Sequence, residues 1–401
     1  MIAEDAAPEI EKMQAGQTDP TPTGDEKAIR VLGLYEAKMS RNADGTLSGK
    51  LGELYNAIGR RFTLAAAESV RLGPMPNYYN LARNYKPDRT TWRASASINP
   101  WAFEQRTAIA EQFLQTWDGQ YDVIVQLHTL YAPGELSRNR PFVIVTDNTY
   151  LNSLRYWPEW VPATSEEARK EWLELELTVY SAASNIFTWS EFTRQSFIND
   201  YRMPADKVIT VGAGANLLQS DITDKRYDSQ TAIFVGYEFE RKGGFYLLEA
   251  WKQVIKALPN AKLYIAGPHH PLADELQGVH WLGRIADREV LRQKLYESTV
   301  FVMPSLFEPY GHAFTEGMGM GLGAIGANHC AMPEIIQDGV NGLLVPPRDI
   351  NALAQALIEI LGDAAYAESL GHAAYEQIKN SRTWDDVISR MAPSLHAITG
   401  K

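Results

Sequence analysis

Short apolar runs alternate with longer segments of mixed polarity along most of the chain. Runs such as AIRVLGLY (28–35) are rich in branched apolar residues, which is typical of parallel strands buried on both faces. The segments between them repeat apolar residues three and four positions apart, as amphipathic helices do. In the first part of the chain, this pattern predicts strands at 28–35, 121–129, 140–149, 185–190 and 207–216, and helices at 51–69, 165–183 and 191–201.

A second rhythm of the same kind starts near residue 231. It predicts strands at 231–237, 261–268, 279–285, 300–305, 323–328 and 341–349, and helices at 240–259, 287–299, 310–321, 331–339 and 350–363. Alternating strands and helices favour parallel sheets with helices on both faces. We therefore expect an α/β fold of two doubly wound, Rossmann-like domains that face each other across a cleft, with ligands beyond the carboxyl ends of the strands.

The domain boundaries follow from the two series of alternating strands and helices and from the polar segments around them. The first 27 residues hold seven acidic and two basic side chains and little that can be buried, so they read as a flexible acidic tail. We expect an N-terminal domain at 28–216, a linker at 217–230, a C-terminal domain at 231–380 and a terminal helix at 381–401.

Charge and composition narrow the class of protein. The 401 residues carry 38 basic and 49 acidic side chains, a net charge of −11, and no basic stripe, which argues against nucleic acid as a partner. Cys330 is the one cysteine, so no internal disulfide is needed. No apolar run reaches the roughly 18 residues of a membrane helix, and the acidic start lacks the apolar region of a secretion signal. These features favour a cytoplasmic location.

Three segments resemble known binding motifs in their letters, but their sequence context argues against a binding site in each case. Residues 321–326 spell G-x-G-x-x-G, but a predicted helix precedes them and a strand follows, which is the reverse of a dinucleotide site. Residues 45–50 resemble a phosphate-binding P-loop that is one residue short, with Leu51 in place of Ser or Thr. His269 and His270 are adjacent and lack further ligands, so a loop pair is favoured over a metal site.

The segment at 300–349 carries the chemistry. A predicted strand ends before Glu308, and Gly311 and His312 open a helix whose first turns contain Glu316. Backbone N–H groups of Gly311, His312 and Ala313 at that helix start suit a phosphate. The two carboxylates, with seven residues between them, can accept hydrogen bonds from hydroxyl groups on either side of a diphosphate, as a nucleotide-sugar would require.

EPYGHAFTE at 308–316 resembles the signature of retaining glycosyltransferase family 4, the glycosyl transferases of group 1, which have the GT-B fold. The resemblance extends over FVGYEFERKGGFYLLEAW (234–251) and covers most of 185–390, whereas the first 180 residues match only in pattern. It implies sugar transfer from a nucleoside-diphosphate donor with retained anomeric configuration and neither a cofactor nor an obligatory metal. The N-terminal domain would then be the acceptor side and the C-terminal domain the donor side, with the terminal helix crossing back to the N-terminal domain.

Arg241 and Lys242 are the candidate diphosphate clamp. They stand beside Gly243 and Gly244 at a strand-to-helix turn, where fixed positive charge would stabilise the leaving phosphate. Many family members have Arg directly after the glycine of FVG, whereas this chain has Tyr237. Arg284 is therefore a second candidate for that charge, and the resemblance also implies that Arg284 and Ile285 contact the nucleotide base, although a surface role is equally open for Arg284.

Candidates in the first domain lie at predicted strand ends or loops that face the cleft. His128 ends a predicted strand, and the resemblance implies that it is a catalytic residue touching the donor sugar or its departing phosphate, although a structural role is equally open. Asp147 ends the next strand as a candidate acceptor contact. Gly49 would admit the donor phosphate or the acceptor, with a plain turn as its alternative. Trp384 and Asp385 start the terminal helix, where we expect packing and capping.

The sequence therefore predicts a retaining hexosyltransferase that uses a UDP-glucose-like or GDP-mannose-like donor and a saccharide, lipid-linked or small-molecule acceptor. Two alternatives remain open: a nucleotide-sugar-binding protein without turnover, and a nucleotide-sugar epimerase or phosphorylase on the same scaffold. A further alternative is a peripheral enzyme at the inner membrane face, because 82–93 mixes basic residues with aromatic ones near Tyr78 and Tyr79.

Overall fold

The computed structural model describes most of the chain from Ala28 to its end. The described residues are 28–39, 42, 46–47, 51–134, 137, 139–162, 164–268, 272 and 275–401. The predicted acidic tail, Gly49 and the pair His269 and His270 lie outside them. In the described part, none of the helices combines the length and apolar character needed to cross a membrane.

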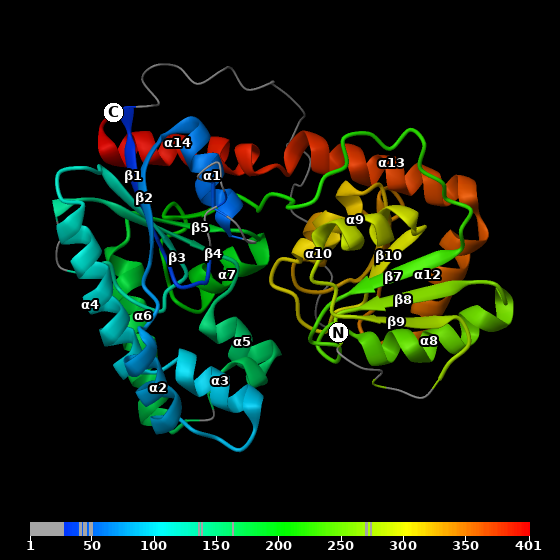
Figure 1. Cartoon of the computed structure of the whole chain (residues 1–401), viewed down its shortest axis with the longest axis horizontal. Coiled ribbons are helices and arrows are strands. Elements are labelled where there is room, and N and C mark those ends of the chain that lie inside the picture. Colours follow the sequence, from blue (N-terminus) through cyan, green and yellow to red (C-terminus); the bar gives the residue numbers. More distant parts are fainter. Residues whose placement is uncertain are drawn as a thin grey trace, which may run out of the picture.

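The described residues form two parallel six-stranded sheets, side by side in Figure 1. The first has the order β2-β1-β3-β4-β5-β6 and the second β12-β11-β10-β7-β8-β9. The strands of the first are β1 (Arg30–Tyr35), β2 (Thr63–Ser69), β3 (Val123–Leu127), β4 (Phe142–Thr146), β5 (Asn185–Thr188) and β6 (Val208–Thr210). Those of the second are β7 (Thr231–Val235), β8 (Lys262–Ala266), β9 (Val279–Gly283), β10 (Val300–Met303), β11 (Gly323–Ala327) and β12 (Gly342–Val345).

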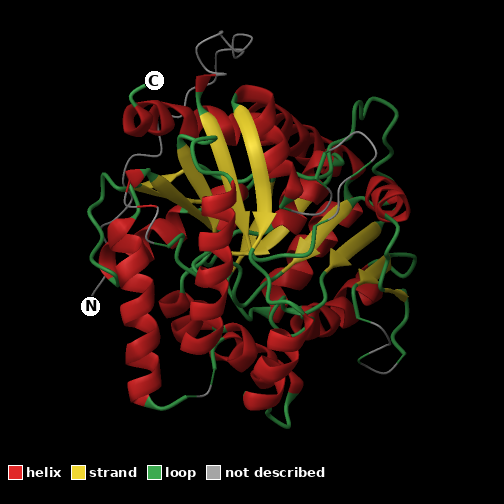
Figure 2. Cartoon of the chain, turned by 60° about the vertical axis from the view of Figure 1, so that its left-hand side comes forward, coloured by secondary structure: helices red, strands yellow, loops and turns green. Residues whose placement is uncertain are grey.

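Helices cover both sheets, and Figure 2 shows the strands between them. In the first domain these are α1 (Gly52–Arg61), α2 (Pro74–Arg83), α3 (Arg89–Ser97), α4 (Pro100–Thr116), α5 (Tyr150–Tyr156), the 3₁₀ helix η3 (Pro158–Trp160), α6 (Glu166–Ala182) and α7 (Glu191–Asn199). The rest are α8 (Gly244–Ala257), α9 (Arg288–Glu297), α10 (His312–Gly319), α11 (Met332–Ile335), α12 (Ile350–Gly362), α13 (Ala364–Ser381) and α14 (Trp384–Thr399). The predicted α/β fold class is confirmed.

Each sheet has a switch point, where neighbouring strands lead to connections on opposite sides. In the second sheet it lies between β7 and β10, and in the first between β1 and β3. The central strands are fully buried apolar runs, as the sequence pattern predicts. Crevices for ligands open at switch points of such sheets, beyond the carboxyl ends of the strands. The fold thus singles out the loops after β7 and β10, and those after β1 and β3.

The prediction of one helix over 51–69 is wrong in its second half. The helix α1 ends at Arg61, and the alanine-rich segment from Thr63 forms strand β2, which pairs in parallel with β1. Alanine has the highest intrinsic helix propensity, but propensity is a weak determinant, and pairing with the buried strand β1 outweighs it. The pattern also failed to predict helices α2, α3 and α4 between β2 and β3.

The terminal helix α14 begins at Trp384, as predicted, and packs on α1 of the first domain (Figure 1). Its cap is not Asp385. The Thr383 hydroxyl accepts from the Asp386 N–H, and the Asp386 carboxylate accepts from the Thr383 N–H, a reciprocal capping box. Asp385 instead forms an ion pair with Arg60 of α1 at 2.8 Å. Trp384 is buried, as its predicted packing role requires.

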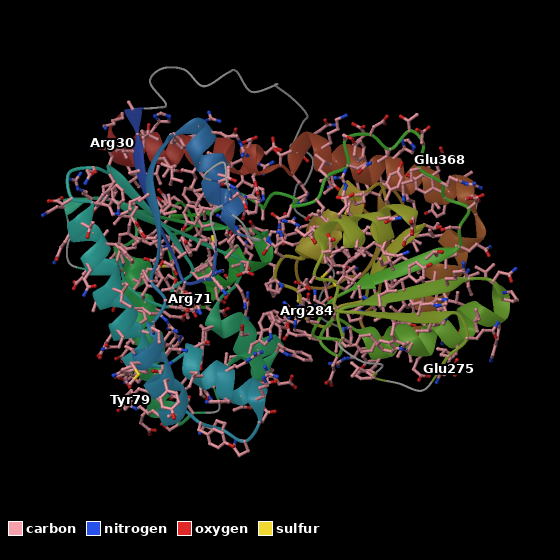
Figure 3. All side chains as sticks on the ribbon, viewed as in Figure 1. Arg30, Arg71, Tyr79, Glu275, Arg284 and Glu368 are labelled. Carbon is pink, nitrogen blue, oxygen red and sulfur yellow. The ribbon has the colours of Figure 1, made fainter. Side chains whose placement is uncertain are left out.

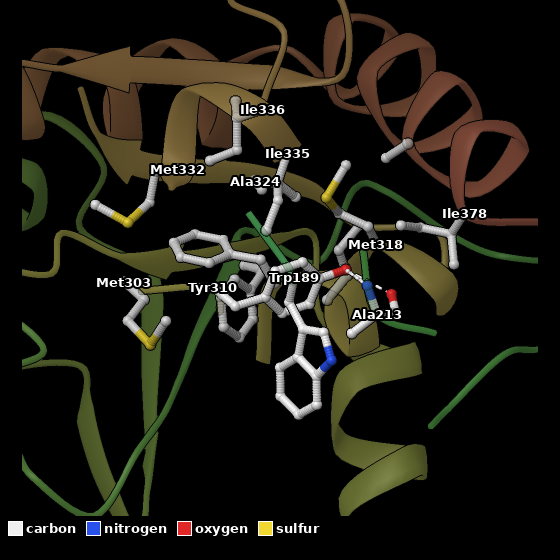
Figure 4. Packing of buried hydrophobic residues seen from close by; sticks show 14 of the residues in the cluster. Trp189, Ala213, Met303, Tyr310, Met318, Ala324, Met332, Ile335, Ile336 and Ile378 are labelled. Atoms are coloured by element: carbon white, nitrogen blue, oxygen red, sulfur yellow. Dashed lines mark hydrogen bonds between the residues drawn. The ribbon is translucent and has the colours of Figure 1, made fainter. Parts of the chain in front are cut away.

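The two domains also meet next to the loop after β10. The Tyr310 hydroxyl donates to the Ala213 carbonyl at 2.5 Å, with Trp189 packed beside the ring (Figure 4). The Glu334 carboxylate accepts from the first two N–H groups of α7 at 2.7 and 2.8 Å. Burial raises the pKa of Glu334, although these two donors oppose the shift. These contacts hold the first domain against the loop that carries Glu308.

Candidate functional site

Lys242 and Glu308 meet at the switch point of the second sheet. Lys242 follows β7 in the turn before α8, and Glu308 follows β10. The Lys242 Nζ lies 2.9 Å from the Glu308 Oε2, and both side chains are largely buried. Two loops distant in sequence thus place a cation and a carboxylate together where the topology opens a crevice.

Glycine is required where these loops approach each other. A Cβ on Gly243, whose φ is +75°, would lie 2.0 Å from the Pro304 carbonyl oxygen. A Cβ on Gly236 would lie 2.1 Å from the Lys242 side chain. Only glycine lets the two segments pack this closely without displacing the lysine.

Arg241 is held behind the site rather than on its surface. Its guanidinium donates to Glu238 at 2.8 Å and to the Phe307 carbonyl at 2.5 Å, and it lies 3.4 Å from the Glu308 carboxylate. Trp160 of η3, from the first domain, covers it at 4.4 Å. With 4% of its surface exposed, Arg241 is suited to fixing the Glu308 loop.

A cavity of about 350 Å³ lies beside Lys242. Helix α10 contributes Ala313 and Glu316 to its wall, and the helix starts after Gly311, whose φ is +105°. That left-handed residue turns the chain so that the first turn of α10 faces the cavity. The remaining described lining residues are Asn216, Leu217, Val235, Gly236, Tyr237, Ala266, Gly267, Ile285, Arg288 and Leu291.

The far wall of the cavity has an aromatic ring and an amide. Tyr237 is 61% exposed, and the Arg284 guanidinium lies over its ring at 5.6 Å (Figure 3 labels Arg284). Ile285 lines the cavity, whereas Arg284 reaches it only through Tyr237. The Asn216 side chain donates to Glu316 at 3.4 Å and accepts from Trp384 at 2.9 Å. A flat ring and a carboxylate facing one cavity suit a nucleoside.

His312 points toward the first domain. It is buried, and its ring lies 4.9 Å from that of Trp189 and 6.1 Å from that of Trp384. Its side chain therefore belongs to the contact between the domains, and its backbone begins α10. Trp189 also faces His128, with 6.5 Å between the ring centres. The Trp189 indole thus contacts candidate residues of both domains, His128 of the first and His312 of the second.

His128 and Asp147 follow adjacent strands of the first sheet. The His128 Nδ1 lies 3.7 Å from the Asp147 carboxylate, and both side chains are about one third exposed. The φ of His128 is +58°, an uncommon conformation for a non-glycine residue. Gln126 donates to its carbonyl at 2.9 Å and supports it. Held strain of this kind occurs preferentially at functional sites.

The structure thus brings together Lys242, Glu308, Ala313, Glu316 and Ile285 around one cavity region. His128 and Asp147 form a second group, and Gly49 lies outside the described residues. Sequence reasoning missed Asn216, Trp160 and the stacking role of Tyr237. Asn216 had a usable signal, since it ends the glycine-rich segment GAGAN before the linker. Trp160 had none, because its partner comes from the other domain.

In sequence, the family model matches the second domain. In fold, solved structures match nearly the whole chain. Residues 229–363 match the family model of the glycosyl transferases group 1. An uncharacterized glycosyltransferase of Methanocaldococcus jannaschii is 26% identical over 233 residues, which cover 53% of this chain and 59% of that protein. The chain therefore spans less than two thirds of that relative.

Two solved structures share the fold. Sucrose-phosphate synthase from Thermosynechococcus elongatus has a TM-score of 0.65 at 18% identity, covering 92% of this chain and 99% of its own. Anabaena HepE in complex with UDP and glucose has a TM-score of 0.59 at 16% identity, covering 92% and 100%. Residues 229–363 thus match the glycosyl transferases group 1, and the chain as a whole has the GT-B fold of two facing parallel sheets that these glycosyltransferase structures share.

Proposed function

We propose that the chain transfers a hexose from a nucleoside-diphosphate donor to a hydroxyl acceptor with retention of anomeric configuration. The observation that carries the proposal is the Lys242–Glu308 pair at 2.9 Å beside a cavity that Glu316 also lines. A cation, a helix start and two carboxylates around one cavity match the charge and the hydroxyl groups of a nucleotide-sugar.

In the proposed complex, each part of the donor contacts a group of the protein around the cavity. The diphosphate lies between the Lys242 ammonium and the N–H groups at the start of α10, where the helix dipole favours negative charge. Glu316 accepts from the ribose hydroxyls, and Glu308 from the sugar hydroxyls. Tyr237 and Ile285 contact the base. Arg241, held by Glu238 and the main chain, positions Glu308.

In the proposed step, the bond between sugar C1 and the phosphate oxygen breaks, and its electron pair stays on that oxygen. The acceptor oxygen forms its bond to C1 on the same face, and its proton passes to the released phosphate oxygen. Negative charge grows on the phosphate as the bond breaks, so the fixed Lys242 cation stabilises the transition state more than the ground state. Interdomain contact at Trp189 helps to exclude water from the reaction.

The donor base and sugar stay open between UDP-glucose-like and GDP-mannose-like compounds. The UDP and glucose bound to Anabaena HepE, a protein of the same fold, favour UDP as the first compound to test. A thermal-shift panel of UDP, GDP and their sugars should raise the melting temperature for one nucleotide series, because a ligand of the folded state stabilises it. A panel without any shift would overturn the proposal.

Product analysis then separates the alternatives. With donor and an acceptor panel, the proposal predicts a glycoside of the same anomeric configuration as the donor. Isomerised donor without acceptor would indicate an epimerase, and dependence on inorganic phosphate a phosphorylase. Because Lys242 would supply the charge that a divalent ion supplies elsewhere, turnover should persist in excess EDTA. Loss of turnover in EDTA with recovery in Mg²⁺ would contradict that role of Lys242.

A further inference from the structure

Exposed aromatic and sulfur-containing side chains gather on one face of helix α2. Met75 is 78% exposed, Tyr78 71% and Tyr79 54%, and their spacing of three and four residues puts them on one side of the helix. Tyr85, just after α2, is 63% exposed. Figure 3 shows Tyr79 at the end of the first domain away from the terminal helix. An exposed apolar cluster of this kind marks an interaction surface.

The same face is positively charged. Residues 74–93, here called the α2–α3 face, hold Arg83, Lys86, Arg89 and Arg93 against Asp88, so four minus one gives +3. The whole chain carries −11. All four cations are exposed, and Asp88 caps α3 by accepting from the Thr91 N–H. Basic charge beside exposed aromatic rings complements an anionic lipid surface.

A cavity of about 320 Å³ adjoins the face, and Arg83 and Lys86 line it. Ser95 also lines it, with 5% of its surface exposed and a hydroxyl that has no hydrogen-bond partner among the described residues. Trp101 and Tyr150 supply aromatic wall. Two cations and a buried hydroxyl without a partner suit the phosphate and hydroxyl groups of a lipid headgroup.

The face is also close to the proposed active site. Helix α3 packs against η3, whose Trp160 covers Arg241 in the second domain. The Trp160 indole further donates to Glu238 at 2.5 Å. A lipid bound at the α2–α3 face would thus have its headgroup on the side of the first domain that meets the donor loops.

We propose that the α2–α3 face docks on an anionic bilayer and that the adjoining cavity takes the headgroup of a phosphate-bearing lipid. Tyrosine and methionine enter the interfacial layer while the four cations meet the lipid phosphates. The identity of the acceptor as such a lipid rests on the proposed function. Docking itself does not, because it needs no donor and no turnover.

The experiment measures binding of the full chain to vesicles by flotation, without any nucleotide. Vesicles of phosphatidylcholine with about one third phosphatidylglycerol should carry the protein upward, whereas pure phosphatidylcholine vesicles should carry at least about tenfold less. Raising the salt concentration should release the protein, because the attraction of basic residues to the surface is screened within a Debye length.

Two double variants test the face, each with a matched control. Arg83→Gln with Lys86→Gln should weaken binding about twenty-five-fold, since each surface cation contributes about fivefold. Met75→Ser with Tyr78→Ser should weaken it by about tenfold or more. The controls, with exposed residues of the second domain, are Lys256→Gln with Lys379→Gln, and Val290→Ser with Val340→Ser. Both controls should float like the unchanged protein.

Equal binding to both kinds of vesicle, binding to neither, or equal losses in test and control variants would each overturn the proposal. A dimer in solution that dissociates in the Met75 and Tyr78 variant would assign the face to a second copy of this chain and overturn it as well. Measurements of the nucleotide-induced thermal shift on the unchanged protein keep the two proposals apart. If the unchanged protein does not float but a nucleotide still raises its melting temperature, only the membrane proposal is overturned. If it floats but no nucleotide raises its melting temperature, only the proposed function is overturned.

Discussion

The two domains have the same layered architecture but differ in the segments that connect their strands. In the second domain, short loops with conformationally required glycines bring Lys242 and Glu308 within 2.9 Å. In the first, the chain between β2 and β3 spans 70–122 and folds into three helices with an exposed aromatic face. Short rigid loops favour one fixed ligand geometry, whereas an inserted helical segment provides a broad surface.

The largest expected effect concerns Lys242, the cation beside the cavity of the second domain. Lys242→Met keeps the length of the side chain and removes the charge, so turnover should fall by about a thousandfold. Initial rates of sugar transfer measure this. Lys252→Met, on the exposed face of α8, is the control and should leave the rate unchanged. A rate within a few-fold of normal in the Lys242 variant would remove the phosphate clamp from the mechanism.

The same contrast explains what could be predicted from the sequence. Strand β10, Glu308 and the start of α10 were predicted because an apolar run, a glycine and a helical repeat stand next to one another in the chain. Segment 63–69 was predicted as helix because local alanine preference gives no information on strand pairing with β1. Helix α2 was not predicted because its helically spaced apolar residues Met75, Tyr78 and Tyr79 are exposed and its buried residue is the polar Asn80. Helix α3 was not predicted because its buried face consists of small residues.

Site residues that depend on the other domain could not be predicted. Arg241 looked like an exposed clamp in the sequence, yet its guanidinium is covered by Trp160 from η3. The capping role expected of Asp385 belongs to Asp386, a difference of one residue that helix periodicity does not resolve. The burial of Arg241 depends on a contact between distant segments, which no local pattern encodes. The capping box of Thr383 and Asp386, in contrast, is a local pattern of two residues three positions apart that the prediction did not use.

The core of the first domain offers a pH-dependent comparison with the second. Glu176 of α6 is buried and accepts from the Tyr201 hydroxyl at 2.7 Å, and burial raises its pKa from 4.5 to about 7. Between these values the folded state keeps a proton that the unfolded state has lost. The free energy of unfolding should therefore fall by about 3 kcal/mol as the pH rises from 4.5 to 7 and level off above.

Hydrogen exchange of α6 at pH 5 and pH 8 measures this fall in the first domain. Glu176→Gln should abolish it, because the amide does not titrate. Glu174→Gln, exposed on the same helix, should retain it. If the exchange protection of α6 in the unchanged protein is equal at both pH values, Glu176 does not titrate in this window and the expectation is wrong.

A smaller effect is expected at Glu316, where nucleotide affinity is measured separately from the rate of sugar transfer. Glu316→Ala should weaken nucleoside-diphosphate binding by about tenfold, because a carboxylate that accepts from two ribose hydroxyls is lost. Titration calorimetry with UDP and GDP measures the affinity. Glu289→Ala, on the exposed side of α9, should bind like the unchanged protein. Equal affinities in both variants would contradict the ribose contact and leave the cavity without its nucleoside assignment.

The smallest expected effect concerns His128. It tests whether residues of the first domain affect only sugar transfer or also nucleotide binding. His128 belongs to the first domain, yet its ring faces Trp189, which in turn packs on His312 of the second domain. If His128 acts on the sugar or on the incoming acceptor, His128→Gln should lower the transfer rate by about fivefold, the loss of one neutral hydrogen bond, with unchanged nucleotide affinity. His372→Gln on α13 controls for the substitution. A parallel loss of nucleotide affinity would move His128 to the donor side and break the division, since the strained backbone of His128 would then serve the phosphate. If neither the transfer rate nor the nucleotide affinity changes, His128 only packs against Trp189 and has no part in the reaction.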